Sequence, residues 1–218
     1  MLRGAKLGLP VFLGYVPVGA AFGLAATAAG FTITQATACS ALVLAGAGQF
    51  IGLAALTSSG NLVAALIATG VVNLRYVLFA ATISPHLRKV PRWNQVLLAF
   101  TLTDETFAIN IGDARAGRAD RFSMLGVGLI SWTGWTLGTL VGATAGSALG
   151  DPSKWGVDFA MPAMFVALLV GQITRRRELI AGALAAVTAL ALSLVLPGQW
   201  PVVVAAITAA TVMTAVPR

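Results

Sequence analysis

The sequence has few of the side chains that build metal centres, disulfides or hydrolytic sites. Cys39 is the only cysteine and His86 the only histidine in 218 residues. One cysteine cannot form an internal disulfide, and metal sites built on His and Cys clusters need more ligands than these two. His86 follows Pro85 at the end of an apolar run, so no nucleophile and base pair is evident. The sequence therefore predicts neither an enzyme nor a bound cofactor.

Charge is also scarce. Charged residues make up 10% of the chain and hydrophobic residues 58%, with a mean hydropathy of +0.89, which is typical of a polytopic membrane protein. The longest polar interruption, 112–121, is too short for a soluble domain, so we expect one integral membrane domain, 1–218. The net charge of +7 lies in short basic clusters between apolar runs. Such clusters orient a membrane protein in the lipid bilayer, and we expect no nucleic-acid partner.

Apolar runs divide the whole chain. They lie at about 10–30, 36–57, 61–83, 95–111, 122–149, 157–173, 179–196 and 200–216. They predict an all-α membrane protein with seven or eight helical segments, because backbone polar groups in hydrocarbon must pair within the segment. No alternating pattern typical of a barrel strand appears. The run 95–111 is short and contains two acids, so it either crosses the membrane or enters and leaves on the same side.

Basic clusters bear on that choice through the positive-inside rule. If every run crosses, the clusters at 88–92 and 115–121 lie on opposite sides of the membrane, which the rule disfavours. If 95–111 does not cross, both clusters lie in the cytoplasm, but Arg3 and Lys6 then lie outside. The sequence leaves both topologies open.

A weak internal similarity suggests two halves, 10–84 and 122–196. The segment CSALVLAGAGQFI (39–51) resembles PAMFVALLVGQIT (162–174). The aligned residues are Gly48, Gln49 with Gly171, Gln172, and Gly19, Gly23 with Gly138, Gly142. With 95–111 not crossing, the halves would form an inverted repeat with broken or re-entrant helices, as in many secondary transporters. Chance similarity between segments rich in Gly and Ala is the alternative.

Asn73, Arg75 and Tyr76 stand in the middle of the run 61–83. A charged side chain at the bilayer centre costs about 2.5–3.5 kcal/mol, and such residues are functional candidates by default. On a regular helix Arg75 would lie about 160° from Asn73, so we expect a backbone break here. Arg75 suits a carboxylate ligand. It could equally pair with an internal acid or extend to the membrane interface.

Two further polar groups interrupt the apolar runs. Gly46, Gly48 and Gln49 favour a helix break that exposes backbone groups, and Gln172 is the counterpart of Gln49 in the other half. A packing kink is the structural alternative. Asp104 and Glu105 are followed by Thr106.

A carboxyl group in a poorly hydrated place can exchange a proton near neutral pH. One of these two acids could therefore serve the substrate's ammonium group or a proton, and the other a structural partner. If the segment lies at the membrane interface, both are simply solvated.

Five segments together resemble the AzlC family of branched-chain amino acid exporters. They are GYVPVGAAFGLAA (14–26), AGAGQF (45–50), VVNLRYVLFAATISPHL (71–87), TDETFA (103–108) and DFAMPAMFVALLVGQ (158–172). The resemblance implies a permease that exports branched-chain amino acids across a bacterial inner membrane, together with a small AzlD-type membrane subunit. Coupling to protons would suit such a permease.

Other functions remain open at the level of the sequence. A passive channel for small solutes would need a continuous polar face, which the sequence does not show, and an accessory membrane subunit would use its polar groups only for packing. The predicted substrate-binding or coupling residues are Gly46, Gly48, Gln49, Asn73, Arg75, Tyr76, Asp104, Glu105, Thr106 and Gln172.

Overall fold

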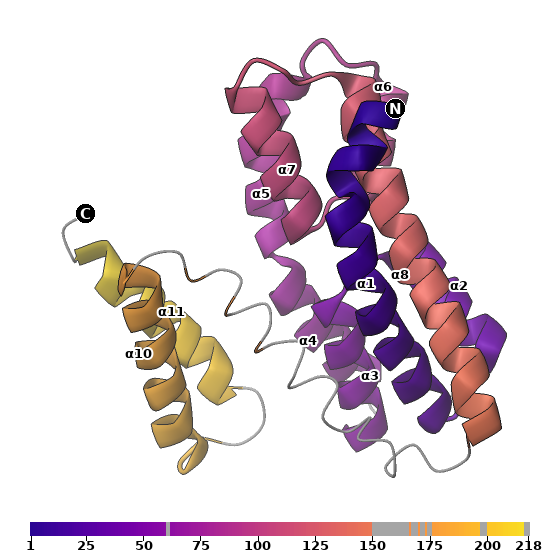
Figure 1. The fold of residues 1–218 in the computed structure, drawn as a ribbon. Coiled ribbons are helices and arrows are strands. Elements are labelled where there is room, and N and C mark those ends of the chain that lie inside the picture. Colours follow the sequence, from indigo (N-terminus) through magenta and orange to yellow (C-terminus); the bar gives the residue numbers. More distant parts are fainter. Residues whose placement is uncertain are drawn as a thin grey trace. The chain divides into compact units, whose positions relative to one another are not determined.

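The computed structural model describes most of the chain, and largely as helices. It describes residues 1–59, 62–149, 166, 170, 173, 176–196 and 200–215. No strand occurs among these residues, so the predicted all-α class is confirmed. The chain forms two compact units, Met1–Met161 and Pro162–Arg218, each of which is described by itself (Figure 1).

Three helical stretches are long and apolar enough to cross a membrane. They are Leu2–Ala28, Ala65–Leu87 and Arg121–Gly146. The apolar helices Ile33–Val43 and Ala47–Thr57 are shorter, and neither reaches the roughly 20 residues that a span needs. Long and half-length helical stretches therefore alternate along the first unit.

Helices α1 (Leu2–Ala28) and α8 (Arg121–Leu149) lie side by side and form the scaffold of the first unit (Figure 1). Their first turns contact each other, and so do their last turns, so the helices run parallel. A Cβ atom on Gly19 would lie 2.6 Å from the carbonyl oxygen of Trp135, and Gly142 touches the backbone of α1. Small residues four apart thus let the two backbones approach closely, as the sequence predicts.

The parallel packing of α1 and α8 bears on the predicted repeat. These helices would begin the halves 10–84 and 122–196, and an inverted repeat requires them to run in opposite directions. They run in the same direction, so this part of the prediction is wrong. The second half continues through 157–173, which lies outside the described residues except at 166, 170 and 173. The repeat itself therefore stays a prediction.

The predicted segment 36–57 is not one crossing helix but a hairpin of two half-length helices. Helix α2 (Ile33–Val43) begins where α1 ends and reaches the middle of the unit. There the Trp132 indole of α8 donates to the Ala41 carbonyl oxygen at 2.9 Å. Helix α3 (Ala47–Ser59) then returns to the end of the unit at which α2 began (Figure 1).

Helices α4 (Leu62–Asn73) and α5 (Arg75–Ile83) form one crossing stretch with a break at Leu74. Helix α4 lies antiparallel to α3, and α5 continues in the same direction toward the end where α1 begins (Figure 1). A short 3₁₀ helix, η1 (Ser84–Leu87), follows at that end. The break that Arg75 leads us to expect is therefore found.

The predicted segment 95–111 is also a hairpin. Helix α6 (Arg92–Phe100) enters from the end where α1 begins, and α7 (Asp104–Arg115) returns to that end (Figure 1). An ion pair of 2.5 Å between Arg3 and Asp113 fixes the last turn of α7 beside the start of α1. Of the two topologies open to this segment, the structure has the one in which it does not cross.

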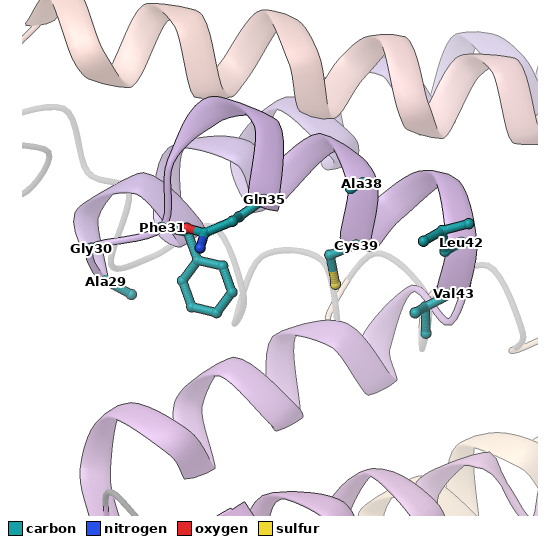
Figure 2. A pocket seen from close by; sticks show the side chains of 8 residues that line it. All are labelled: Ala29, Gly30, Phe31, Gln35, Ala38, Cys39, Leu42 and Val43. Atoms are coloured by element: carbon teal, nitrogen blue, oxygen red, sulfur yellow. The ribbon is translucent and has the colours of Figure 1, made fainter.

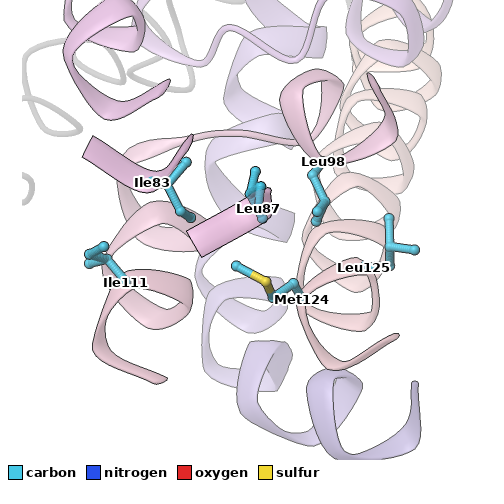
Figure 3. Close-up of a cluster of buried hydrophobic side chains, with 6 residues drawn as sticks. All are labelled: Ile83, Leu87, Leu98, Ile111, Met124 and Leu125. Carbon is cyan, nitrogen blue, oxygen red and sulfur yellow. The ribbon is translucent and has the colours of Figure 1, made fainter. Parts of the chain in front are cut away.

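A cluster of buried apolar side chains holds this hairpin to the scaffold (Figure 3). Its members come from α5, η1, α6, α7 and α8, and they are Ile83, Leu87, Leu98, Ile111, Met124 and Leu125. The cluster lies near the end of the unit where α1 begins, because each of these elements starts or finishes there.

The described basic residues of the first unit, apart from Arg75, gather at this same end, which we call the basic end. They are Arg3, Lys6, Arg88, Lys89, Arg92, Arg115, Arg118 and Arg121. The expectation that a non-crossing 95–111 leaves Arg3 and Lys6 on the other side is wrong. It assumed that 36–57 crosses, whereas α2 and α3 turn back and bring both clusters to one end.

The second unit contains helices α10 (Arg176–Ser193) and α11 (Trp200–Ala215). They pack against each other as an antiparallel pair, and the Arg177 guanidinium near the start of α10 donates to the Met213 carbonyl oxygen near the end of α11. These helices correspond to the runs predicted at 179–196 and 200–216.

Candidate functional site

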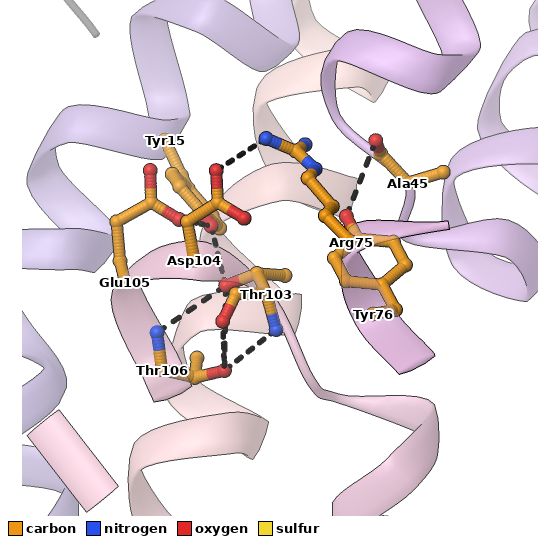
Figure 4. A network of polar contacts seen from close by, with 8 residues as sticks. All are labelled: Tyr15, Ala45, Arg75, Tyr76, Thr103, Asp104, Glu105 and Thr106. Atoms are coloured by element: carbon orange, nitrogen blue, oxygen red, sulfur yellow. Dashed lines mark hydrogen bonds and ion pairs between the residues drawn. The ribbon is translucent and has the colours of Figure 1, made fainter. Parts of the chain in front are cut away.

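Three helix breaks meet in the middle of the first unit. They separate α2 from α3 at residues 44–46, α4 from α5 at Leu74, and α6 from α7 at residues 101–103. Polar side chains from two of the breaks and from α1, together with the Ala45 carbonyl oxygen at the third break, form a network (Figure 4). Backbone groups at broken helices inside a membrane are tolerated where protein or a polar cavity satisfies them.

Arg75 and Asp104 join two of these breaks. The Arg75 Nη1 atom lies 2.5 Å from the Asp104 Oδ2 atom, and their side chains are 30% and 22% exposed. The Arg75 guanidinium also lies over the ring of Tyr76, 5.3 Å from its centroid. The Tyr76 hydroxyl lies 3.5 Å from the Ala45 carbonyl oxygen, at the third break (Figure 4). Of the roles that the sequence left open for Arg75, the structure therefore shows pairing with an internal acid, Asp104.

Glu105 turns to α1 instead. The Tyr15 hydroxyl donates to the Glu105 Oε2 atom at 2.5 Å and lies 2.8 Å from the Thr103 hydroxyl. The Tyr15 ring packs edge-on against Trp135 of α8, with centroids 5.4 Å apart. Adjacent acids thus point to different elements, Asp104 to α5 and Glu105 to the scaffold.

Thr103 and Thr106 begin helix α7. The Thr103 hydroxyl accepts from the Thr106 amide at 3.3 Å, and the Thr106 hydroxyl accepts from the Thr103 amide at 2.8 Å. This capping box satisfies amides that would otherwise lack partners. The predicted site residue Thr106 is therefore committed to the helix cap. Asp104 and Glu105 occupy the first turn, where the helix dipole favours negative charge.

The break between α2 and α3 depends on Gly46 and Gln49. Gly46 has φ +52°, a left-handed conformation that costs other residues about 1–2 kcal/mol. The side-chain oxygen of Gln49, Oε1, accepts from the backbone amide of Ala45 at 3.3 Å. The side-chain nitrogen of Gln49, Nε2, donates to the Ser40 hydroxyl at 3.1 Å. Gln49 is buried and serves the break itself, which corresponds to the packing alternative of the sequence prediction.

Gly48 and Asn73 bring α3 and α4 together at the network. A Cβ atom on Gly48 would lie 2.8 Å from the side-chain amide of Asn73, so the glycine makes room for this side chain. The Thr69 hydroxyl donates to the Gly48 carbonyl oxygen at 3.4 Å. The predicted residues Gly48 and Asn73, far apart in sequence, are thus neighbours.

Three buried polar atoms of residues that flank the α4–α5 and α6–α7 breaks lack a hydrogen-bond partner. They are Asn73 Oδ1, Arg75 Nε and Asp104 Oδ1. Most buried polar side-chain atoms have a partner in protein or water, and each exception needs an explanation. One donor and two acceptors without partners suit a small ligand that carries both charges, or ordered water.

A separate pocket of about 510 Å³ lies where α1 turns into α2 (Figure 2). Phe31, Gln35, Cys39 and Leu42 are among its lining residues. The lining is mainly apolar and includes none of the network residues drawn in Figure 4. The polar network is therefore the better candidate for solute recognition.

Most of the predicted site residues converge. Nine of them lie at or beside the three breaks, and Gln172 lies outside the described residues. The sequence reasoning missed Tyr15. A buried tyrosine hydroxyl usually finds a hydrogen-bond partner, and the chain has only two tyrosines, so a tyrosine in the middle of the first span was an available signal.

Comparison with known proteins agrees with this reading of the sequence. The AzlC protein family matches residues 10–149. The inner membrane protein YgaZ of Escherichia coli is 34% identical over 86% of this chain and 81% of its own length. An uncharacterized membrane protein of Archaeoglobus fulgidus is 32% identical over 80% of this chain and 76% of its own length.

A relative with a named activity is the branched-chain amino acid transport protein AzlC of Bacillus subtilis. It is 26% identical over 78% of this chain and 66% of its own length. No solved structure matches the chain. The long apolar helices and the membrane-protein relatives agree on a multi-pass membrane protein. With the family match over most of the first unit, this chain belongs to the AzlC family.

Proposed function

We propose that this protein is a secondary transporter that exports branched-chain amino acids across a bacterial inner membrane, together with a separate small AzlD-type subunit. The observation that carries the proposal is the polar network at three helix breaks, centred on Arg75 and Asp104. The name of the Bacillus subtilis relative supports the substrate, and that of the Escherichia coli relative supports the inner membrane.

The chemistry of the network fits a zwitterion. Arg75 keeps one buried donor, Nε, without a partner, and guanidinium groups suit carboxylates. The carboxylates of Asp104 and Glu105 can accept from an ammonium group. Transporters commonly place such sites near the midplane, between broken helices. Proton coupling through one of the two acids belongs to the same proposal.

Two hairpins from opposite ends favour a carrier over a passive channel. Helices α2 and α3 enter from one end of the unit and α6 and α7 from the other, and their turns meet at the network. The polar side chains gather at this level, whereas a pore would need them along the whole crossing. A solute bound there would lie between the turns of the two hairpins, which suits a carrier with alternating access.

The basic end supports the orientation. Residues 7–74 and 122–150 contain no charged residue, so the opposite end of the first unit has none in its described part. By the positive-inside rule the basic end lies in the cytoplasm.

The proposal is tested by counterflow of labelled leucine and valine in proteoliposomes that contain this chain with and without its small partner. A pH gradient is imposed on half of the samples. Exchange that needs both subunits and increases with the gradient is expected. Protein-free liposomes and an exposed variant, Arg118→Ala, are the controls. No exchange of any apolar amino acid in any condition would refute the proposal.

A further inference from the structure

The two adjacent acids of α7 have different electrostatic partners. Asp104 faces Arg75 at 2.5 Å, so its charge has a cation opposite to it. Glu105 makes no ion pair within the described part of the chain, and its hydrogen-bond donor is the neutral hydroxyl of Tyr15. An uncompensated carboxylate within a membrane is costly, which makes Glu105 the acid that a cationic group would join.

Tyr15 is held firmly by the scaffold. Its ring packs against Trp135 of α8, and α1 and α8 are in contact along their length through glycines. Its hydroxyl reaches across to the first turn of α7, where it meets Glu105 and Thr103 (Figure 4). The hydroxyl thus fixes one oxygen of the Glu105 carboxylate, Oε2.

The other oxygen of that carboxylate remains available. Glu105 Oε1 has no hydrogen bond to the described part of the protein, and the Glu105 side chain is only half-buried. The other ionisable groups of the network are Asp104 on the same helix, and Arg75 and Tyr76 on α5. Arg75 is engaged with Asp104, so it does not neutralise Glu105.

We infer that Tyr15 is a positioning residue, which directs the Glu105 carboxylate toward the ammonium group of the substrate while Asp104 remains the counter-ion of Arg75. This inference rests on the proposed function and assigns different roles to its two acids, Asp104 and Glu105. Glu105 recognises the ammonium group, and the Arg75 side of the network recognises the carboxylate.

Two analogues of leucine separate these roles. 3-Methylbutylamine keeps the ammonium group and lacks the carboxylate, and 4-methyl-2-oxopentanoate keeps the carboxylate and lacks the ammonium group. Both are used as competitors of leucine counterflow in proteoliposomes that contain the complete complex. The variant Tyr15→Phe keeps the ring against Trp135 and removes only the hydroxyl.

For Tyr15→Phe we expect the KM for leucine and the inhibition constant of the amine to rise together, by roughly tenfold, the effect of one charge-assisted hydrogen bond. Inhibition by the oxo acid should stay as in the wild type. Glu105→Gln should have the same selective effect, and the double variant should add little, because the hydroxyl acts through the carboxylate. Thr133→Val removes a hydroxyl that bonds only within α8 and is the matched control.

Unchanged amine inhibition in Tyr15→Phe, or an equal loss of amine and oxo acid inhibition, would overturn the inference. A wild type that exchanges no amino acid refutes the proposed function instead. The same variants are then compared by thermal stabilisation of the purified complex with the amine. If the amine stabilises the wild type but not the variants, the role of Tyr15 and Glu105 is supported. If the amine does not stabilise the wild type, the role is rejected.

Discussion

Arg75 and Asp104, 29 positions apart in the sequence, form an ion pair of 2.5 Å that ties the broken crossing stretch α4–α5 to the turn of the α6–α7 hairpin. The contact uses one nitrogen and one oxygen, and leaves Arg75 Nε and Asp104 Oδ1 without partners. A pair that served stability alone would be expected to use both donors and both acceptors, as bidentate pairs do.

The first prediction concerns this pair. Arg75→Ala and Asp104→Asn should abolish transport while expression stays normal, because the first removes the cation that faces the substrate's carboxylate and the second removes the counter-ion of that cation. The exchanged variant Arg75→Asp with Asp104→Arg should assemble with the small subunit but should not regain transport. Measurement is by counterflow and by co-purification of the partner. Wild-type flux in either single variant would refute the assignment, and flux in the exchanged variant would assign the pair a structural role.

The second prediction concerns topology. In a Cys39→Ser background, single cysteines at Lys89 and Ala116 should be protected from a membrane-impermeant maleimide in intact cells, because both lie at the basic end. A cysteine at Ala28 should be labelled, since α1 ends at the opposite end of the unit. Permeabilised cells provide the control for reactivity. Labelling of only one of Lys89→Cys and Ala116→Cys would show that the segment between them crosses.

The third prediction concerns the contact between α1 and α8. Gly19→Ala places a methyl group 2.6 Å from the Trp135 carbonyl oxygen, and overpacking of this kind costs about 1–3 kcal/mol. The thermal unfolding midpoint of the purified protein should therefore fall. Gly14→Ala, on the same helix, meets no atom within 4 Å and should leave the midpoint equal or higher, since Ala favours helices. Equal midpoints for both variants would argue against close packing at Gly19.

The fourth prediction concerns the turn between α2 and α3. Gly46→Ala forces a side chain into a left-handed conformation at φ +52°, at a cost of about 1–2 kcal/mol. It should reduce transport, because the turn carries the Ala45 carbonyl oxygen that faces Tyr76. Gly70→Ala, in α4 with no neighbour within 4 Å, is the matched control. The transport rates of the two variants are compared at equal amounts of protein. An equal loss of transport in both variants would contradict the role of the turn.

Much of the site could be predicted from the sequence because polar residues in apolar runs are costly. Arg75 and the acids at 104–105 stood out for that reason, and Gly46 indicated a break. Gln49 and Thr106 were identified for the same polarity, yet their side chains serve a helix break and a helix cap. Composition reveals that a polar group needs a partner, but not whether that partner is the protein's own backbone.

The sequence by itself determined an all-α membrane protein, its apolar runs and the polar residues within them. Only the tertiary structure decided that 33–59 and 92–115 turn back, which brings the described basic residues of the first unit, apart from Arg75, to one end and three breaks to one level. The physical reason is that an apolar run of about 20 residues can lie in the hydrocarbon core of the bilayer either as one crossing helix or as two half-length helices. Hydrophobicity alone does not distinguish the two. What selects the hairpin is contact between distant positions, such as Arg75 with Asp104 and Tyr15 with Glu105.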